Sequence, residues 1–160
     1  MSTRDEIVSA NEQYAGSFDK GELPMPPGRR FAVVTCMDAR LDPAAFLGLE
    51  EGDAHVIRNA GGIVTEDAIR SLVISHHLLG TEQAFVIGHT DCGMVTFSND
   101  DLHGKLGADS EAIDFQPFPD VAGRVRESLK AIEDSPLLPD GYGAAGYVYD
   151  VHTGRIDPVQ

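Results

Sequence analysis

Short apolar runs separated by helix-like stretches organise the hydrophobic pattern of this chain. The first run, Phe31-Ala-Val-Val-Thr35, has four consecutive apolar residues, which predicts a strand buried on both faces. Residues 53–58 and 83–88 are predicted to form two further strands, and the alternating residues 146–151 a fourth. His152-Thr-Gly154 then predicts a hairpin turn into a short returning strand.

Four helices are predicted, over residues 3–16, 43–48, 66–79 and 121–133. The second is predicted from its end residues, with Asp42 as the N-cap, Pro43 as the first helical residue and an end near Gly48. Thr65 is placed to cap the third helix and Gly80 to end it. We expect this helix to be largely buried between the sheet and a neighbour. The N-terminal helix has only a modest apolar stripe, so it must dock on its own sheet or on a second subunit.

The connections between these elements predict a parallel sheet. Residues 83–88 follow helix 66–79 after a few residues, so strand, helix and strand form a crossover unit. Residues 21–28 contain three prolines and predict an extended connector, and the polar residues 98–120 predict a surface excursion with room for a short helix. The 160 residues are expected to form a single domain.

Reactive side chains follow two of the predicted strands. Cys36, Asp38 and Arg40 come where the first strand ends, and His89 and Cys92 come after residues 83–88. In a parallel sheet these ends share one edge, and neighbouring strands lie ~4.8 Å apart, so the side chains can share an ion. Two thiolates and one imidazole suit zinc and leave a fourth position to fill.

Composition narrows the class of protein further. A net charge of −14 argues against nucleic acid and anionic membranes as partners. No apolar run is long enough to span a bilayer, and the N-terminus lacks a signal-peptide core, so we expect a cytoplasmic protein. The two cysteines could form a disulfide, but a reducing cytosol and their charged neighbours favour a metal or a reactive thiol. The chain lacks the Cys-x-x-Cys pair of a thiol redox protein.

Three motifs together resemble the β-class carbonic anhydrases, in particular their compact bacterial and archaeal branch. They are Cys36-x-Asp38-x-Arg40, Arg58-Asn-Ala-Gly-Gly62 and His89-x-x-Cys92-Gly93, and the resemblance is strongest over residues 31–97. It implies an α/β fold, with a mainly parallel four-stranded sheet, an added antiparallel strand and flanking helices. It also implies a homodimer, or a dimer of dimers, in which subunits exchange helix 3–16. Ala39 departs from the serine of many members.

The resemblance implies one Zn²⁺ per chain, held by Cys36, His89 and Cys92. The implied activity is reversible hydration of carbon dioxide to bicarbonate and a proton by zinc-bound hydroxide. Asp38 and Arg40 are the implied catalytic pair: Arg40 can draw the carboxylate off the metal, whereas Asp38 as fourth ligand would close the site. The residues implied on the substrate side are Asn59, Gly61 and Gly62.

Other interpretations remain open from the sequence. Asp38 and Arg40 also fit a plain salt bridge, and the paired glycines an ordinary turn. Relatives of this architecture hydrolyse carbonyl sulfide or carbon disulfide at the same kind of site. A non-catalytic zinc-binding or bicarbonate-sensing module would keep Asp38 on the metal.

Overall fold

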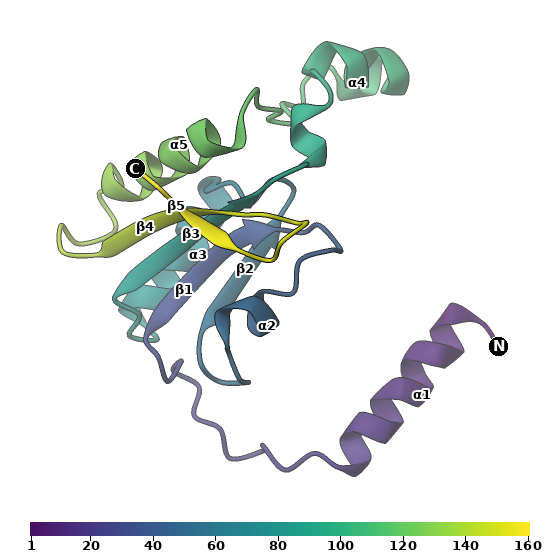
Figure 1. The fold of residues 1–160 in the computed structure, drawn as a ribbon, viewed down its shortest axis with the longest axis vertical. Coiled ribbons are helices and arrows are strands. Elements are labelled where there is room, and N and C mark those ends of the chain that lie inside the picture. The colour runs from purple at the N-terminus through teal and green to yellow at the C-terminus, as the bar shows by residue number, and fades with distance from the viewer.

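Five strands form one mixed sheet in the computed structural model, which describes all of residues 1–160 (Figure 1). The strands are β1 (Phe31–Cys36), β2 (His55–Asn59), β3 (Gln83–His89), β4 (Gly143–Tyr149) and β5 (Ile156–Val159). Their order is β2-β1-β3-β4-β5; the first four are parallel, and β5 pairs antiparallel with β4. This confirms the predicted fold class.

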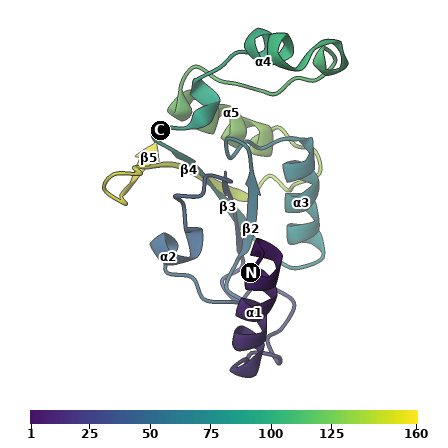
Figure 2. The same ribbon diagram turned by 90° about the vertical axis from the view of Figure 1, so that its right-hand side faces the viewer.

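Helices flank this sheet on both faces, but unequally. Helices α3 and α5 cover one face, and the short α2 lies on the opposite side (Figure 2). The helices are α1 (Thr3–Gly16), α2 (Pro43–Leu47), α3 (Glu66–His77), α4 (Asn99–Leu106) and α5 (Val121–Glu133), with 3₁₀ turns at Gly93–Val95 and Ala108–Ser110. The face that carries α2 is therefore only partly covered.

The predicted caps are present. The Thr65 side chain accepts a hydrogen bond from the backbone N–H of Ala68 at 3.2 Å and begins α3. Asp42 caps α2 in the same way, and Gly48 ends that helix in the left-handed conformation, with φ +61°. These local bonds satisfy amide groups that a helix leaves without intrahelical partners, so the sequence specifies where each helix starts.

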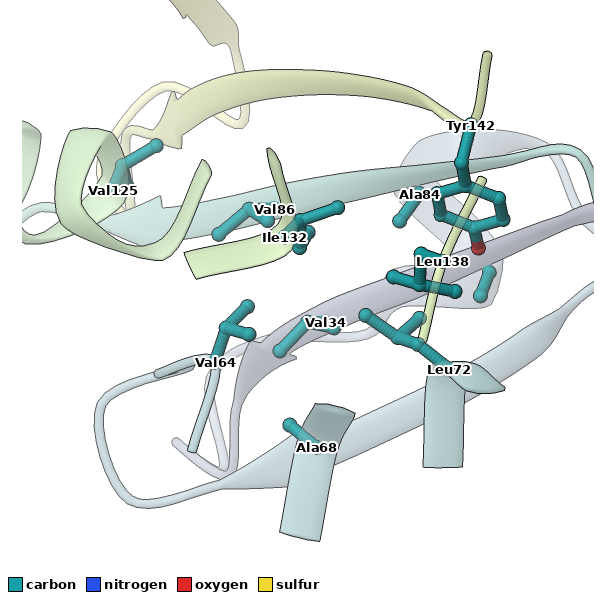
Figure 3. Close-up of a cluster of buried hydrophobic side chains, with 11 residues drawn as sticks. Val34, Val64, Ala68, Leu72, Ala84, Val86, Val125, Ile132, Leu138 and Tyr142 are labelled. Carbon is teal, nitrogen blue, oxygen red and sulfur yellow. The ribbon is translucent and has the colours of Figure 1, made fainter. Parts of the chain in front are cut away.

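The main core lies between the sheet and helices α3 and α5 (Figure 3). Val34 of β1 and Val86 of β3 are fully buried against Leu72 of α3. Val125 of α5 packs close to β4, where a Cβ at Gly146 would lie 2.6 Å from its Cγ1. Cutting Leu72 to alanine would cost about 2–5 kcal/mol in such a core.

Several predicted boundaries differ from the structure. Strand β2 runs over His55–Asn59 rather than 53–58. Helix α3 ends at His77 rather than 79, and Leu78 beyond it is 75% exposed. Strand β4 runs over Gly143–Tyr149 rather than 146–151, because glycine and alanine residues at its start give no strand pattern yet pair with β3. The predicted hairpin into β5 is present, closed by a bond from the Asp150 amide to the Arg155 carbonyl.

Helix α1 stands apart from the rest of the chain (Figure 1). None of its residues is buried. It touches the body through Tyr14, whose hydroxyl donates to Glu51 at 2.9 Å, and the connector adds an ion pair from Lys20 to the same carboxylate.

Helix α3 is buried only on the side that faces the sheet. Ile74, on the face that points away from the sheet, is 38% exposed, so the predicted burial against a neighbour is not seen within this chain. None of the helices combines the length and the hydrophobicity that a membrane span needs.

Candidate metal centre

The carboxyl ends of the adjacent strands β1 and β3 place the three predicted ligands together. Cys36 is the last residue of β1 and His89 the last of β3, and Cys92 follows after one tight turn. The two strands are in parallel register, and the buried hydroxyl of Thr35 donates to the carbonyl of Ile87 at 2.8 Å. That bond fixes the strand ends relative to each other just below the ligands.

The ligand atoms of Cys36, His89 and Cys92 lie within 4.8 Å of one another. All three residues are buried, with 5%, 1% and 2% exposure, and both cysteines are free thiols. Tetrahedral zinc, with bonds of ~2.3 Å to sulfur and ~2.0 Å to nitrogen, needs ligand atoms roughly 3.5–3.8 Å apart. The three ligand atoms therefore lie close enough for small side-chain shifts of about 1 Å to bring them to the spacing that zinc requires.

The hydrogen bonding of His89 leaves one ring nitrogen for a metal. Its Nδ1 lies 2.8 Å from the carbonyl oxygen of Thr90, which makes Nδ1–H the donor and directs Nε2 toward the sulfurs. Nε2 is buried and has no hydrogen-bond partner. Buried polar atoms are rarely left without a partner, so this nitrogen fits a metal ligand.

The two predicted glycines form the backbone beside Cys36. Gly61 donates its N–H to Cys36 Sγ at 3.4 Å, and both glycines have positive φ, +90° and +62°. A Cβ at Gly62 would lie 2.8 Å from the backbone nitrogen of Cys36, and one at Gly61 would lie 2.9 Å from Phe118. Close approach thus requires glycine at both positions.

Asp38 and Arg40 form a bidentate ion pair next to the ligands. Arg40 Nε donates to Asp38 Oδ1 at 3.0 Å, and Nη2 donates to Oδ2 at 2.8 Å. The backbone N–H of Arg40 adds a bond of 2.8 Å to Oδ1. Asp38 Oδ2 lies 3.7 Å from Nε2 of His89, so the carboxylate borders the cluster while Arg40 holds it.

Two further charged residues support this pair, and the sequence analysis gave neither a role. Arg40 also binds Asp91, through Nη1 to Oδ2 at 2.8 Å and through Nη2 to the backbone carbonyl at 2.9 Å. Arg58 donates to the carbonyls of Cys36 at 2.9 Å and Asp38 at 2.8 Å. Both residues lie within the three motifs of the sequence analysis, Arg58 in the glycine motif and Asp91 between His89 and Cys92. A position in a motif does not show which residues it will bind.

The electrostatic environment at this edge of the sheet favours the ionised forms of the Asp38 and Cys36 side chains. Hydrogen bonds from the Arg40 side chain and backbone hold the pKa of Asp38 well below its usual range. The hydrogen bond with the Cys92 thiol lowers the pKa of Cys36 well below its usual range, and the same contact raises the pKa of Cys92. Burial alone would lower the pKa of His89, but the neighbouring Cys36 and the Thr90 carbonyl raise it. Binding a dication would therefore displace a proton from Cys92.

The structure gives other motif residues structural bonds. Both amide atoms of the Asn59 side chain bond the backbone of Ile63, at 2.8 and 2.9 Å, and close the glycine turn. A contact of Asn59, Gly61 or Gly62 with substrate stays a prediction. Among the histidines without an assigned role, His55 bonds Ser75 at 2.8 Å, away from the ligand cluster.

The mixed α/β sheet and the buried Cys-His-Cys cluster at its edge together define a site able to bind a metal ion. The sequence profile of the carbonic anhydrase family matches residues 31–134. The chain belongs to the β-carbonic anhydrase family, a family of carbonate dehydratases.

Particular relatives match the chain over nearly its whole length. It is 46% identical to β-carbonic anhydrase 1 of Mycobacterium tuberculosis over 163 residues, 99% of each chain. A carbon disulfide hydrolase of Acidianus is 34% identical over 179 residues, which cover 95% of this chain and 86% of that one. The crystal structure of carbonic anhydrase from Streptococcus mutans superposes with a TM-score of 0.93 at 46% identity, covering 100% and 99% of the two chains.

Proposed function

We propose that this protein binds one Zn²⁺ through Cys36, His89 and Cys92 and catalyses the reversible hydration of carbon dioxide to bicarbonate and a proton. The observation that carries this proposal is the buried cluster of two thiols and one unpartnered imidazole nitrogen within 4.8 Å. Zinc held there would supply a Lewis acid that lowers the pKa of a water in its fourth position towards neutrality.

Asp38 is the group that would orient the nucleophilic water. Its carboxylate borders the cluster, and its lowered pKa keeps it ionised at neutral pH, so it can only accept a hydrogen bond. Arg40 holds both carboxylate oxygens and thereby restrains Asp38 from the metal's fourth position. Together they would fix the lone pair of the attacking oxygen toward the substrate.

The surroundings of the cluster suit a small apolar substrate. Met94, Phe118 and Ile63 are buried around the Gly61 backbone, next to Cys36. Carbon dioxide carries no charge and has no hydrogen to donate, so such a wall accepts it without leaving polar groups unpaired. The product bicarbonate is anionic and is less favoured against this wall.

Hydrolysis of carbon disulfide or carbonyl sulfide is a second candidate function. The observation in its favour is the 34% identity to a carbon disulfide hydrolase over 95% of the chain. These gases are linear like carbon dioxide and would meet the same nucleophile. The 46% identity to a β-carbonic anhydrase over 99% of the chain favours carbon dioxide.

Stopped-flow measurement of carbon dioxide hydration by the zinc-loaded protein, from about pH 6 to 9, tests these proposals. The turnover of carbon disulfide and carbonyl sulfide is measured on the same preparation. We expect hydration to exceed hydrolysis of either sulfur gas and to rise with pH as water ionises. Faster sulfur-gas turnover would favour the second candidate. One bound zinc with negligible turnover of all three gases would favour a non-catalytic, bicarbonate-sensing module with Asp38 on the metal.

We propose a homodimer in which helix α1 packs on the second copy. The support is that α1 buries none of its residues in its own chain, although Ile7 and Val8 are apolar. The partly covered sheet face also has an apolar cavity of about 340 Å³, which Phe85 and Tyr147 help to line. Analytical ultracentrifugation should show a dimer, or a dimer of dimers, and Ile7→Asp should weaken it. A wild-type monomer at micromolar concentration would contradict this.

We also propose a cytoplasmic location. Two thiol ligands must stay reduced to bind zinc, and the cytosol keeps them so. Cell fractionation tests this, and recovery outside the cytoplasm would contradict it.

A further inference from the structure

The contact between Asp91 and Arg40 has no part in the ligand set or in the catalytic pair. Arg40 offers five N–H donors, and four contacts with two aspartates occupy its fork. Nε and Nη2 bind Asp38, while Nη1 binds the Asp91 carboxylate and Nη2 the Asp91 carbonyl. The guanidinium is therefore held from two sides, and each carboxylate takes a different edge.

Because the Arg40 side chain is partly exposed to solvent, its contact with Asp91 restrains it more than the contact with Asp38 alone would. The side chain of Arg40 is 46% exposed, whereas that of Asp38 is 17% exposed. An arginine side chain at the surface has many accessible rotamers, so one carboxylate partner restrains it only weakly. A second partner on a different edge removes rotamers that would swing the guanidinium away from Asp38.

Asp91 lies in the loop that carries two of the ligands, in a left-handed backbone conformation. Asp91 has φ +54°, a left-handed conformation that glycine, asparagine and aspartate adopt more readily than other residues. It lies between His89 and Cys92, in the loop that carries two of the three ligands. The carboxylate at this position reaches Arg40 at 2.8 Å, so the loop that holds the metal ligands also holds the arginine.

We propose that Asp91 is a positioning residue that locks Arg40 in the orientation that keeps Asp38 off the metal. The consequence for metal coordination rests on the proposed zinc site, whereas the restraint on Arg40 does not. Removing the Asp91 carboxylate leaves the ligands in place but lets Arg40 move. Asp38 then occupies the fourth position of the metal in a larger fraction of molecules.

Asp91→Gly tests this, because glycine removes the carboxylate, tolerates the positive φ and keeps the backbone carbonyl. The first readout is the exchange of the Arg40 Nε proton with water, measured by ¹⁵N–¹H NMR on the metal-free protein, with the signal assigned by its loss in Arg40→Lys. We expect exchange about threefold faster in Asp91→Gly, the scale of an exposed ion pair. Asp91→Asn keeps a side-chain oxygen and the tolerance for left-handed backbone, so it should fall between wild type and glycine.

The second readout is the absorption spectrum of the cobalt(II)-substituted protein at one pH, with Asp38→Ala as the reference for a metal without the carboxylate. The ratio of Asp38-bound to Asp38-free cobalt should rise about threefold in Asp91→Gly. Glu82→Gln is the matched control, because it breaks another exposed arginine pair, with Arg30 at 2.7 Å, far from the ligands. It should change neither readout.

Either readout can overturn the proposal. Exchange and cobalt spectra of Asp91→Gly that match wild type, or that match Glu82→Gln, would remove the positioning role. If Asp91→Gly does not fold, the same comparison with Asp91→Asn decides. Neither readout needs turnover. A zinc-loaded wild type without activity would therefore refute the proposed hydration activity but would leave the conclusion about Asp91 unchanged.

Discussion

Gly62→Ala adds a methyl group where the backbone of the glycine turn contacts the end of strand β1. Gly62 has φ +62°, and a Cβ there would lie 2.8 Å from the backbone nitrogen of Cys36 and 2.8 Å from the carbonyl carbon of Thr35. Both are main-chain atoms of a buried central strand, so neither can move aside by rotating a side chain. The strand end, and with it the first ligand, must shift.

The expected cost of Gly62→Ala follows from these two features. A left-handed residue with a Cβ costs about 1–2 kcal/mol, and overpacking a tight site costs about 1–3 kcal/mol. Together they predict a loss of about 2–5 kcal/mol, a large share of the roughly 5–15 kcal/mol of a typical domain. Because Cys36 moves, zinc affinity should fall as well.

Urea unfolding in the presence of a chelator measures the loss of stability in Gly62→Ala without a contribution from metal. Gly104→Ala is the matched control, since Gly104 lies in α4 with nothing within 4 Å of its Cβ position and no positive φ. That control should gain about 0.5–1 kcal/mol from helix propensity. A loss below about 0.5 kcal/mol for Gly62→Ala would refute the assigned role of close backbone approach.

Three further predictions concern the cluster itself. Cys92→Ser removes one of two buried thiolate ligands, so zinc measured by atomic absorption should fall well below one per chain; stoichiometric zinc would rule out Cys92 as a ligand. Asp38→Ala should keep zinc bound but lower the carbon dioxide hydration rate by about 10²-fold or more, as for loss of a positioned group, and an unchanged rate would reduce the pair to a plain salt bridge. Arg40 lowers the pKa of Asp38 in the folded protein, so the ionised carboxylate stabilises the fold above its unfolded pKa of ~3.9, and this contribution is lost as the pH falls. The stability difference between metal-free wild type and Asp38→Asn should therefore shrink in urea unfolding from about pH 5 to pH 2, and a constant difference would contradict it.

Sequence periodicity predicted the parallel strands because buried strands are continuous apolar runs, as in Phe31–Cys36. The meeting of Cys36 with His89 followed from the same logic, since parallel strands end at one edge. The start of β4 was missed because small residues fit that strand for packing reasons: Gly146 has α5 directly above it. Such a requirement comes from a partner element and leaves no local pattern.

The hydrogen bonds around the ligands were less predictable. Asp38 and Arg40 are two residues apart, so their pairing is a local matter, and the sequence suggested it. Asp91 reaches Arg40 across 51 residues, and Arg58 reaches Cys36 across 22. Which nitrogen meets which oxygen depends on the loop conformation at each strand end, including the left-handed φ at Asp91. Composition does not encode that geometry.

X-ray absorption at the zinc K edge of the zinc-loaded protein tests the central claim most directly. The account predicts one zinc per chain, with two sulfur neighbours at ~2.3 Å and one imidazole nitrogen at ~2.0 Å, and with the sulfur count falling from two to one in any metal kept by Cys36→Ser. A zinc shell without sulfur, or an unchanged shell in that variant, would contradict it.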